Sequence, residues 1–171
     1  TIQIGQRVGV DNSMIVSVLH RLADIEQMRL DQRQALRAYE NIKNLDGSDV
    51  KAREMLITLN FRLNDPAGAI TEMDGLLRVY AQQRNGKAIL TLLEHWAKER
   101  PQEDSIRMRL ASVYEQIKRP DKALALLDNL LDRQLNNNRT QEACKTLKRI
   151  LGLRPENRDR YVNLVNQIGC G

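Results

Sequence analysis

The chain has 171 residues, of which 42% are hydrophobic and 29% are charged, and its formal net charge is +5. This length suffices for a buried core, and no segment approaches the roughly 20 consecutive apolar residues that a membrane span needs. The start of the sequence also lacks the apolar core of a signal peptide. Because the first residue is Thr1, we expect a piece of a longer protein or a processed one.

The first segment differs from the rest of the chain. Residues 1–12 are rich in Gly, Val and Gln, and we expect an irregular lead-in there. Over residues 13–171, Leu, Ile, Ala and Val recur at helical spacing between short polar turns, a pattern typical of amphipathic helices. We therefore expect a single helical domain after the lead-in.

The apolar pattern of the first helix pair returns after 34 residues, the offset from Leu22 to Leu56. The positions that share this offset stand in two sets, Leu22, Ala35, Tyr39 and Ile42 in the first copy and Leu56, Ala69, Met73 and Leu76 in the second. Such self-similarity is the sequence signature of a repeat protein, in which each unit buries its apolar face against its neighbours.

A third copy is the clearest. Leu110, Ala111 and Tyr114 are followed by a turn at 118–121 and then by Ala123, and Pro155 closes a later unit. These residues resemble the tetratricopeptide repeat, whose small residues let two antiparallel helices approach closely. The resemblance implies an all-α, right-handed superhelical solenoid of stacked antiparallel hairpins, with about eight helices.

A longer period is also present, because Pro66 and Pro120 share a 54-residue offset. Since 54 is not a multiple of 34, we interpret each longer block as three helices, with the third over 86–99 and over 140–151. The predicted units are 16–49, 50–101, 104–155 and a terminal helix over 156–168.

Catalytic and metal-binding patterns are missing from the sequence. His20 and His95 have no partner at a recognised ligand spacing, and Gly86-Lys87 lacks the other residues of a phosphate-binding loop. We therefore predict no enzyme, no cofactor and no metal site, and we expect His20 on an exposed helix face. Cys144 is expected as a buried apolar residue and Cys170 as an exposed thiol, which is compatible with a reducing, cytoplasmic compartment.

The tetratricopeptide resemblance implies that the first helix of each hairpin lines a concave groove that binds a partner. The groove residues would be His20, Asp24, Lys51, Glu54, Thr58, Phe61, Met108, Ser112 and Glu115. His20 and Asp24 occupy places where chaperone-binding members carry Lys and Asn, so a chaperone-tail adaptor is not predicted.

Positive charge gathers in the segment 139–160. The basic patch predicted there consists of Lys145, Lys148, Arg149, Arg154 and Arg158. The first interpretation is a solvated face on a terminal unit. Docking of an acidic protein segment comes next, and binding of nucleic acid third, because aromatic side chains that could stack on bases are scarce near the patch.

The final helix carries one apolar stripe, which packs inward or covers a neighbouring copy, so a homo-oligomer is a further alternative. Taken together, these features predict a protein–protein interaction scaffold within a larger, bacterial-type assembly, binding a peptide or helix in its groove. The alternative is a nucleic-acid-binding helical repeat that uses residues 139–160.

Overall fold

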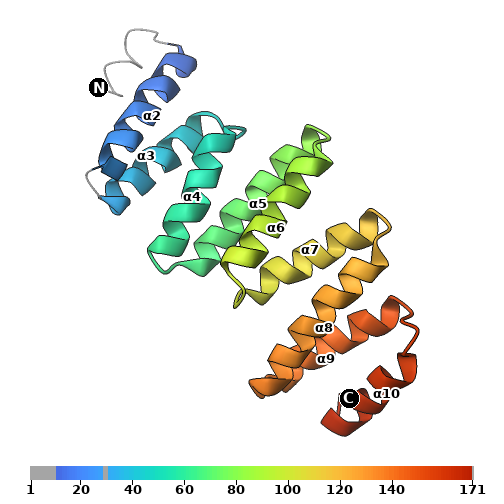
Figure 1. Ribbon diagram of the computed structural model, residues 1–171. Helices are drawn as coiled ribbons and strands as arrows, with labels where there is room; N and C mark the ends of the chain where they lie inside the picture. Colours follow the sequence, from blue (N-terminus) through green and yellow to red (C-terminus); the bar gives the residue numbers. More distant parts are fainter. Residues whose placement is uncertain (1–10, 29–30, 171) are drawn as a thin grey trace. The chain divides into compact units, whose positions relative to one another are not determined.

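The computed structural model describes residues 11–28 and 31–170, so most of the predicted lead-in lies outside the described residues. The described residues form nine α-helices and no strand, and the chain divides into two compact units, unit 1 (Thr1–Gly86) and unit 2 (Lys87–Gly171). The helices are α2 (Asn12–Met28), α3 (Gln32–Leu45), α4 (Val50–Arg62), α5 (Pro66–Gln82), α6 (Gly86–Glu99), α7 (Asp104–Gln116), α8 (Pro120–Asn136), α9 (Thr140–Gly152) and α10 (Arg158–Ile168) (Figure 1).

Unit 1 is a succession of helices in which α2 packs on α3, α3 on α4 and α4 on α5 (Figure 1). Aspartates start three of these helices: the side chain of Asp31, Asp49 or Asp65 accepts a hydrogen bond from the backbone amide three residues later. Such caps satisfy amides that the helix itself leaves without a partner. Short capped turns between amphipathic helices produce the predicted hairpins.

The core of unit 1 follows the 34-residue pattern with one correction. The second-helix positions Ala35, Tyr39, Ile42, Ala69, Met73 and Leu76 are all 0% exposed, and Leu56 is 1% exposed. Leu22, however, is 45% exposed, because α2 turns Leu19 and Ala23 toward α3 instead. Leu22 belongs to a row of exposed apolar side chains along α2, which consists of Met14, Val18, Leu22, Ile25 and Met28.

Unit 2 repeats the frame of unit 1 at the 54-residue offset. Helices α4 and α7 both have 13 residues, helices α5 and α8 both have 17, and each second helix begins with a proline. The predicted third helices are present as α6 and α9. Within the unit, α7 packs on α8, α8 on α9 and α9 on α10.

The turns that follow α4, α5, α7, α8 and α9 share one backbone device. Each contains one residue with positive φ, and these residues are Asn64, Arg84, Lys118, Asn138 and Arg154. In the turn after α7, the Arg119 amide donates to the Tyr114 carbonyl at 2.8 Å, which is the closing bond of a Schellman motif. The same turn thus follows helices of both 13 and 17 residues.

The prediction of two independent cysteines is wrong. Cys144 on α9 and Cys170 after α10 form a disulfide, with their Cα atoms 5.4 Å apart. This separation lies within the usual range for such bonds. The two residues are 26 positions apart in sequence, but α10 folds back onto α9 and brings them together.

Among the described residues, no helix combines the length and the apolar character that crossing a membrane requires.

Candidate functional site

Within unit 1, the predicted groove residues of α2 and α4 contact one another. The Lys51 ammonium lies 3.1 Å from the Asp24 carboxylate, and both side chains are about half-exposed. Asp24 also accepts a hydrogen bond from the Tyr39 hydroxyl at 3.0 Å, and Gln27 donates to the same hydroxyl at 2.9 Å. This polar ladder of Gln27, Tyr39, Asp24 and Lys51 joins α2 to α4, two helices that are not adjacent in sequence.

The protonation states of this ladder are set by its contacts. Burial alone would raise the pKa of Asp24, but hydrogen bonds from Lys51 and Tyr39 outweigh it and lower that pKa below its usual value. Burial, aided by the neighbouring Asp24 carboxylate, raises the pKa of the Tyr39 hydroxyl to about 12. At neutral pH the ladder therefore holds an ionised carboxylate and a neutral phenol.

His20 is half-buried rather than exposed, contrary to the prediction from sequence. Its Nε2 lies 2.8 Å from the Asp49 carboxylate, and only 17% of its side chain is exposed. Its ring also meets the edge of the Tyr39 ring at a centroid distance of 6.0 Å. His20 thus connects α2 to the start of α4 beside the ladder.

The remaining predicted groove residues of α4 differ in what they offer a partner. Glu54 is exposed and accepts a hydrogen bond from the Tyr80 hydroxyl at 3.1 Å. Thr58 donates its hydroxyl to the Glu54 carbonyl of its own helix. Phe61 is only 7% exposed and belongs to the core, so it presents little surface to a partner.

In unit 2, a single arginine contacts all three predicted groove residues of α7. Arg149 on α9 donates to the Glu115 carboxylate at 2.7 Å, to the Ser112 hydroxyl at 2.6 Å and to the Met108 carbonyl at 3.1 Å. Arg149 and Glu115 are 34 residues apart, which is the period found in the sequence. Opposite charges one period apart could have predicted this contact.

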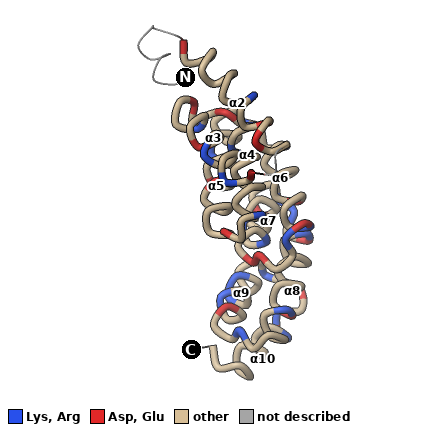
Figure 2. The backbone as a smooth tube through the Cα atoms, turned by 90° about the vertical axis from the view of Figure 1, so that its left-hand side faces the viewer, with Lys and Arg blue, Asp and Glu red and all other residues tan. Residues whose placement is uncertain are grey.

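Fewer side chains of the basic patch are available to a partner than the sequence implies, since Arg149 is hydrogen-bonded to α7. Arg139 in the same segment pairs with Asp104 at 2.9 Å and with Glu142 at 3.3 Å. Lys145 and Lys148 are exposed. Figure 2 shows basic and acidic segments interspersed along α9 and its neighbours. The exposed members Arg154 and Arg158 lie near the start of α10.

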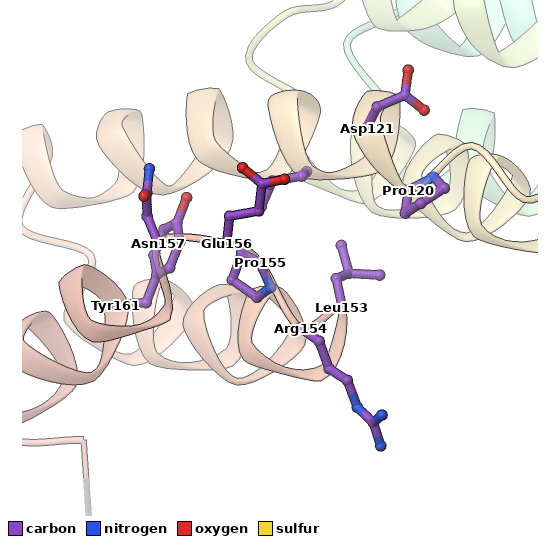
Figure 3. Close-up of a pocket in the computed structure, with 9 residues that line it drawn as sticks. Pro120, Asp121, Leu153, Arg154, Pro155, Glu156, Asn157 and Tyr161 are labelled. Atoms are coloured by element: carbon purple, nitrogen blue, oxygen red, sulfur yellow. The ribbon is translucent and has the colours of Figure 1, made fainter.

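A pocket of about 400 Å³ lies in unit 2 between the start of α8 and the connection from α9 to α10. Its walls include Pro120, Leu124 and Tyr161, and the Tyr161 hydroxyl donates to Asp128 at 2.8 Å. Figure 3 shows the Arg154 side chain extending away from Glu156 and Asp121. The residues that line the pocket carry charges of both signs, from Asp121 and Glu156 and from Arg154.

Within residues 11–28 and 31–170, no group of three or more His, Cys, Asp or Glu side chains is arranged to hold a metal ion. The polar groups of the site are instead paired with one another.

Comparison with known proteins gave structural neighbours only. No family model matches the chain, and no curated protein matches its sequence. The crystal structure of MamA protein has a TM-score of 0.39 and 17% identity, covering 90% of this chain and 89% of that one. The structure of YrrB, described as a TPR protein with an unusual peptide-binding site, has a TM-score of 0.33 and 13% identity, covering 80% of this chain and 85% of that one.

The assignment of the fold rests on the helices themselves. Short antiparallel hairpins, small buried residues at the predicted repeat positions and recurring turns are the features of a tetratricopeptide-like array. Both units of this chain are tetratricopeptide-like.

Proposed function

We propose that the chain is a protein-interaction module of a larger protein, and that it holds a peptide or a helix against α2 and α4 in unit 1 and against α7 and α9 in unit 2. The observation that carries this proposal is the pair of polar contacts between alternate helices, Asp24 with Lys51 and Glu115 with Arg149. These contacts fix side chains before a partner arrives, which reduces the entropy lost on binding.

The exposure of these side chains supports the same function. Lys51 is 53% exposed and Asp24 is 50% exposed, so both can exchange water for groups of a partner while keeping their own contact. Met108 and Ser112 are half-buried on α7 and add apolar and hydroxyl surface beside Glu115. A mixed surface of this kind suits a peptide that carries both polar and apolar side chains.

The test is capture of partners by the immobilised full chain from a lysate of the source cells, with and without nuclease, followed by mass spectrometry. A double substitution, Lys51→Ala with Glu54→Ala, removes one charge of each sign from α4. The matched control is Arg37→Ala with Glu40→Ala, which removes the same charges from exposed positions of α3.

We expect proteins that survive nuclease treatment to be retained by the wild type and by the α3 control. The α4 variant should retain them about tenfold less well, as loss of central interface contacts implies. Equal retention by both variants would argue against this surface. Retention that disappears with nuclease and with salt would favour the nucleic-acid alternative through residues 139–160.

A further inference from the structure

The 54-residue repeat places Arg53 on α4 and Arg107 on α7 at the same position of two equivalent helix pairs. In unit 1, α4 packs on α5, and in unit 2, α7 packs on α8. The two arginines can therefore be compared directly, because the same frame surrounds them. Their polar partners differ.

Arg53 has a carboxylate within its own unit. Its Nη1 donates to Glu72 on α5 at 3.2 Å, and Lys43 on α3 donates to the other oxygen of Glu72 at 2.6 Å. The Glu72 residue is only 9% exposed. Gly75 gives the guanidinium room, since a Cβ there would lie 2.2 Å from Nη1 of Arg53. Two cations and one carboxylate are thus joined in a half-buried cluster.

Arg107 has neither an equivalent carboxylate nor an equivalent glycine on α8. At the 54-residue offset, Leu126 stands in place of Glu72 and Asn129 stands in place of Gly75. The Nη1 atom of Arg107 is buried, and no acceptor among the described residues lies within hydrogen-bond distance of it. A buried guanidinium nitrogen without an acceptor is unfavourable, because burial removes its hydrogen bonds to water and no protein acceptor replaces them.

The Asp104 carboxylate, whose charge acts on Arg107, is already engaged. Asp104, one turn before Arg107 on α7, pairs with Arg133, with Arg139 at 2.9 Å and with the Gln134 amide at 2.9 Å. Burial lowers the pKa of Arg107, the charge of Arg133 lowers it further, and Asp104 opposes both effects. Arg107 and Asp104 thus lie one turn apart on α7, and two other arginines, Arg133 and Arg139, share the Asp104 carboxylate.

We propose that Arg107, with Arg133 and Arg139 beside it, is a binding site for the carboxylate of an Asp or Glu side chain supplied by a protein partner. This inference rests on the proposed function and specifies the chemistry of the partner in unit 2. The Arg107 residue is half-buried as a whole although its Nη1 is buried, so a carboxylate at the surface reaches the exposed part of the side chain, and a turn of the guanidinium brings Nη1 to it. The incoming carboxylate takes the part that Glu72 takes for Arg53, and arginine suits it because the guanidinium can donate two parallel hydrogen bonds.

The test measures binding of a hexaglutamate peptide to the full chain by isothermal titration calorimetry at about 50 mM salt, where surface charges are weakly screened. Hexaglutamine is the uncharged control peptide. Arg107→Gln removes the guanidinium, and Leu126→Glu supplies a carboxylate at the position of Glu72. Leu126→Gln controls for polarity at that position, and Arg158→Gln removes an exposed charge from the basic patch.

We expect Arg107→Gln and Leu126→Glu each to weaken hexaglutamate binding about tenfold or more, as loss of a hydrogen bond between charged groups implies. Leu126→Gln and Arg158→Gln should change it less than about twofold, because single surface charges contribute little. The internal carboxylate of Leu126→Glu should also raise the unfolding temperature relative to Leu126→Gln. This second comparison keeps the test decisive if Arg107→Gln folds poorly.

Three results would overturn the inference. Hexaglutamate could fail to bind the wild type, it could bind Leu126→Glu as well as Leu126→Gln, or Arg158→Gln could weaken it as much as Arg107→Gln does. Binding of a thymidine decanucleotide that depends on Arg107 and resists competition by hexaglutamate would reassign the site to nucleic acid. The capture experiment on α4 of unit 1 is independent, so a failure there removes the proposed function without altering the peptide result.

Discussion

Helices α4 and α5 of unit 1 have the same lengths as α7 and α8 of unit 2, but the starts of the helices differ between the units. In unit 1, α3, α4 and α5 begin with an aspartate whose side chain accepts a hydrogen bond from the helix. In unit 2, the residues before α7, α8, α9 and α10 make no such side-chain bond, and they are Glu103, Arg119, Arg139 and Asn157. The two units therefore share buried apolar positions but differ in the polar groups at the starts of their helices.

A second difference concerns what holds each unit together besides its apolar core. Unit 1 has the Glu72 cluster with Lys43 and Arg53. Unit 2 has the disulfide between Cys144 and Cys170. The comparison indicates that burial of the repeat positions defines the fold, whereas ion pairs, caps and the disulfide are particular to each unit.

The disulfide is where we expect the largest effect. Closing a loop of 26 residues contributes about 3.5 kcal/mol through the unfolded chain. Reduction, or the double substitution Cys144→Ser with Cys170→Ser, should therefore destabilise unit 2 and leave unit 1 nearly unchanged. Hydrogen exchange measured with and without reductant would reveal faster exchange in α9 and α10.

The control for this prediction is the serine variant itself, which reductant should not affect. Alkylation of protein purified without reductant should label neither cysteine before reduction. If α3 and α4 exchange faster to the same extent as α10, the disulfide acts on the whole chain, and the expectation that unit 1 remains nearly unchanged is wrong.

The next effect is expected at Glu72. Replacing it by leucine, the residue at the equivalent position of unit 2, leaves Lys43 and Arg53 half-buried without their shared carboxylate. Breaking such a pair should destabilise unit 1 by about 2 kcal/mol, below the range for fully buried pairs because these side chains keep some water. Urea unfolding followed by circular dichroism measures the change.

An exposed glutamate provides the control for this substitution. Glu40→Leu on α3 makes the same chemical change at an exposed position and should alter the free energy of unfolding by less than about 0.5 kcal/mol. A loss at Glu72 no larger than the loss at Glu40 would mean that the cluster contributes nothing, and Arg53 would cease to be a template for Arg107.

Sequence periodicity predicted the apolar frame because burial depends on residue size and spacing alone. Ala35, Met73 and Ala123 all occupy the fully buried positions that the repeat assigned to them. Leu22 failed because it lies on a helix face that no described neighbour covers. The predicted third helices are present because their turn residues and their apolar spacing agree.

The polar contacts were harder to predict, because each depends on where a long side chain ends. Arg149 was interpreted as part of a free basic patch, although it is held by Glu115 and Ser112. The cysteine pairing was missed because a separation of 26 residues carries no signal until α10 is known to fold back. The sequence also does not show that Arg107 lacks a carboxylate partner, because the ion pair between Arg53 and Glu72 is visible only in the folded chain.

The next effect concerns four buried tyrosines, two in each unit, whose ionisation should lower the stability of both units at alkaline pH. Tyr39 and Tyr80 in unit 1, and Tyr114 and Tyr161 in unit 2, each donate a hydrogen bond to a carboxylate. Burial, aided by that carboxylate, raises the pKa of each phenol to about 12. The folded chain therefore holds these protons to a higher pH than the unfolded chain does.

A raised pKa stabilises the fold fully below pH 10 and no longer does so once the pH passes about 12. Ultraviolet absorbance should accordingly report tyrosinate formation together with unfolding in both units. Tyr39→Phe or Tyr161→Phe should each cost about 1.5 kcal/mol at neutral pH and flatten the loss of stability above pH 10. Ionisation near pH 10 without unfolding would contradict the hydrogen bonds to carboxylates.

The smallest effects are expected at the helix starts, where Asp65 in unit 1 and Arg119 in unit 2 occupy equivalent positions. Asp65→Ala removes the bond to the Gly68 amide and should lower the free energy of unfolding by about 1 kcal/mol. Arg119→Asp should raise it by a similar or smaller amount, because Lys122 stands where Gly68 allows the carboxylate a close approach. Arg119→Ala is the control, since it removes only an exposed ion pair with Asp121. If Arg119→Asp and Arg119→Ala have equal unfolding midpoints in urea, the start of α8 cannot accept a cap. The difference between the units would then lie in backbone geometry rather than in the identity of one side chain.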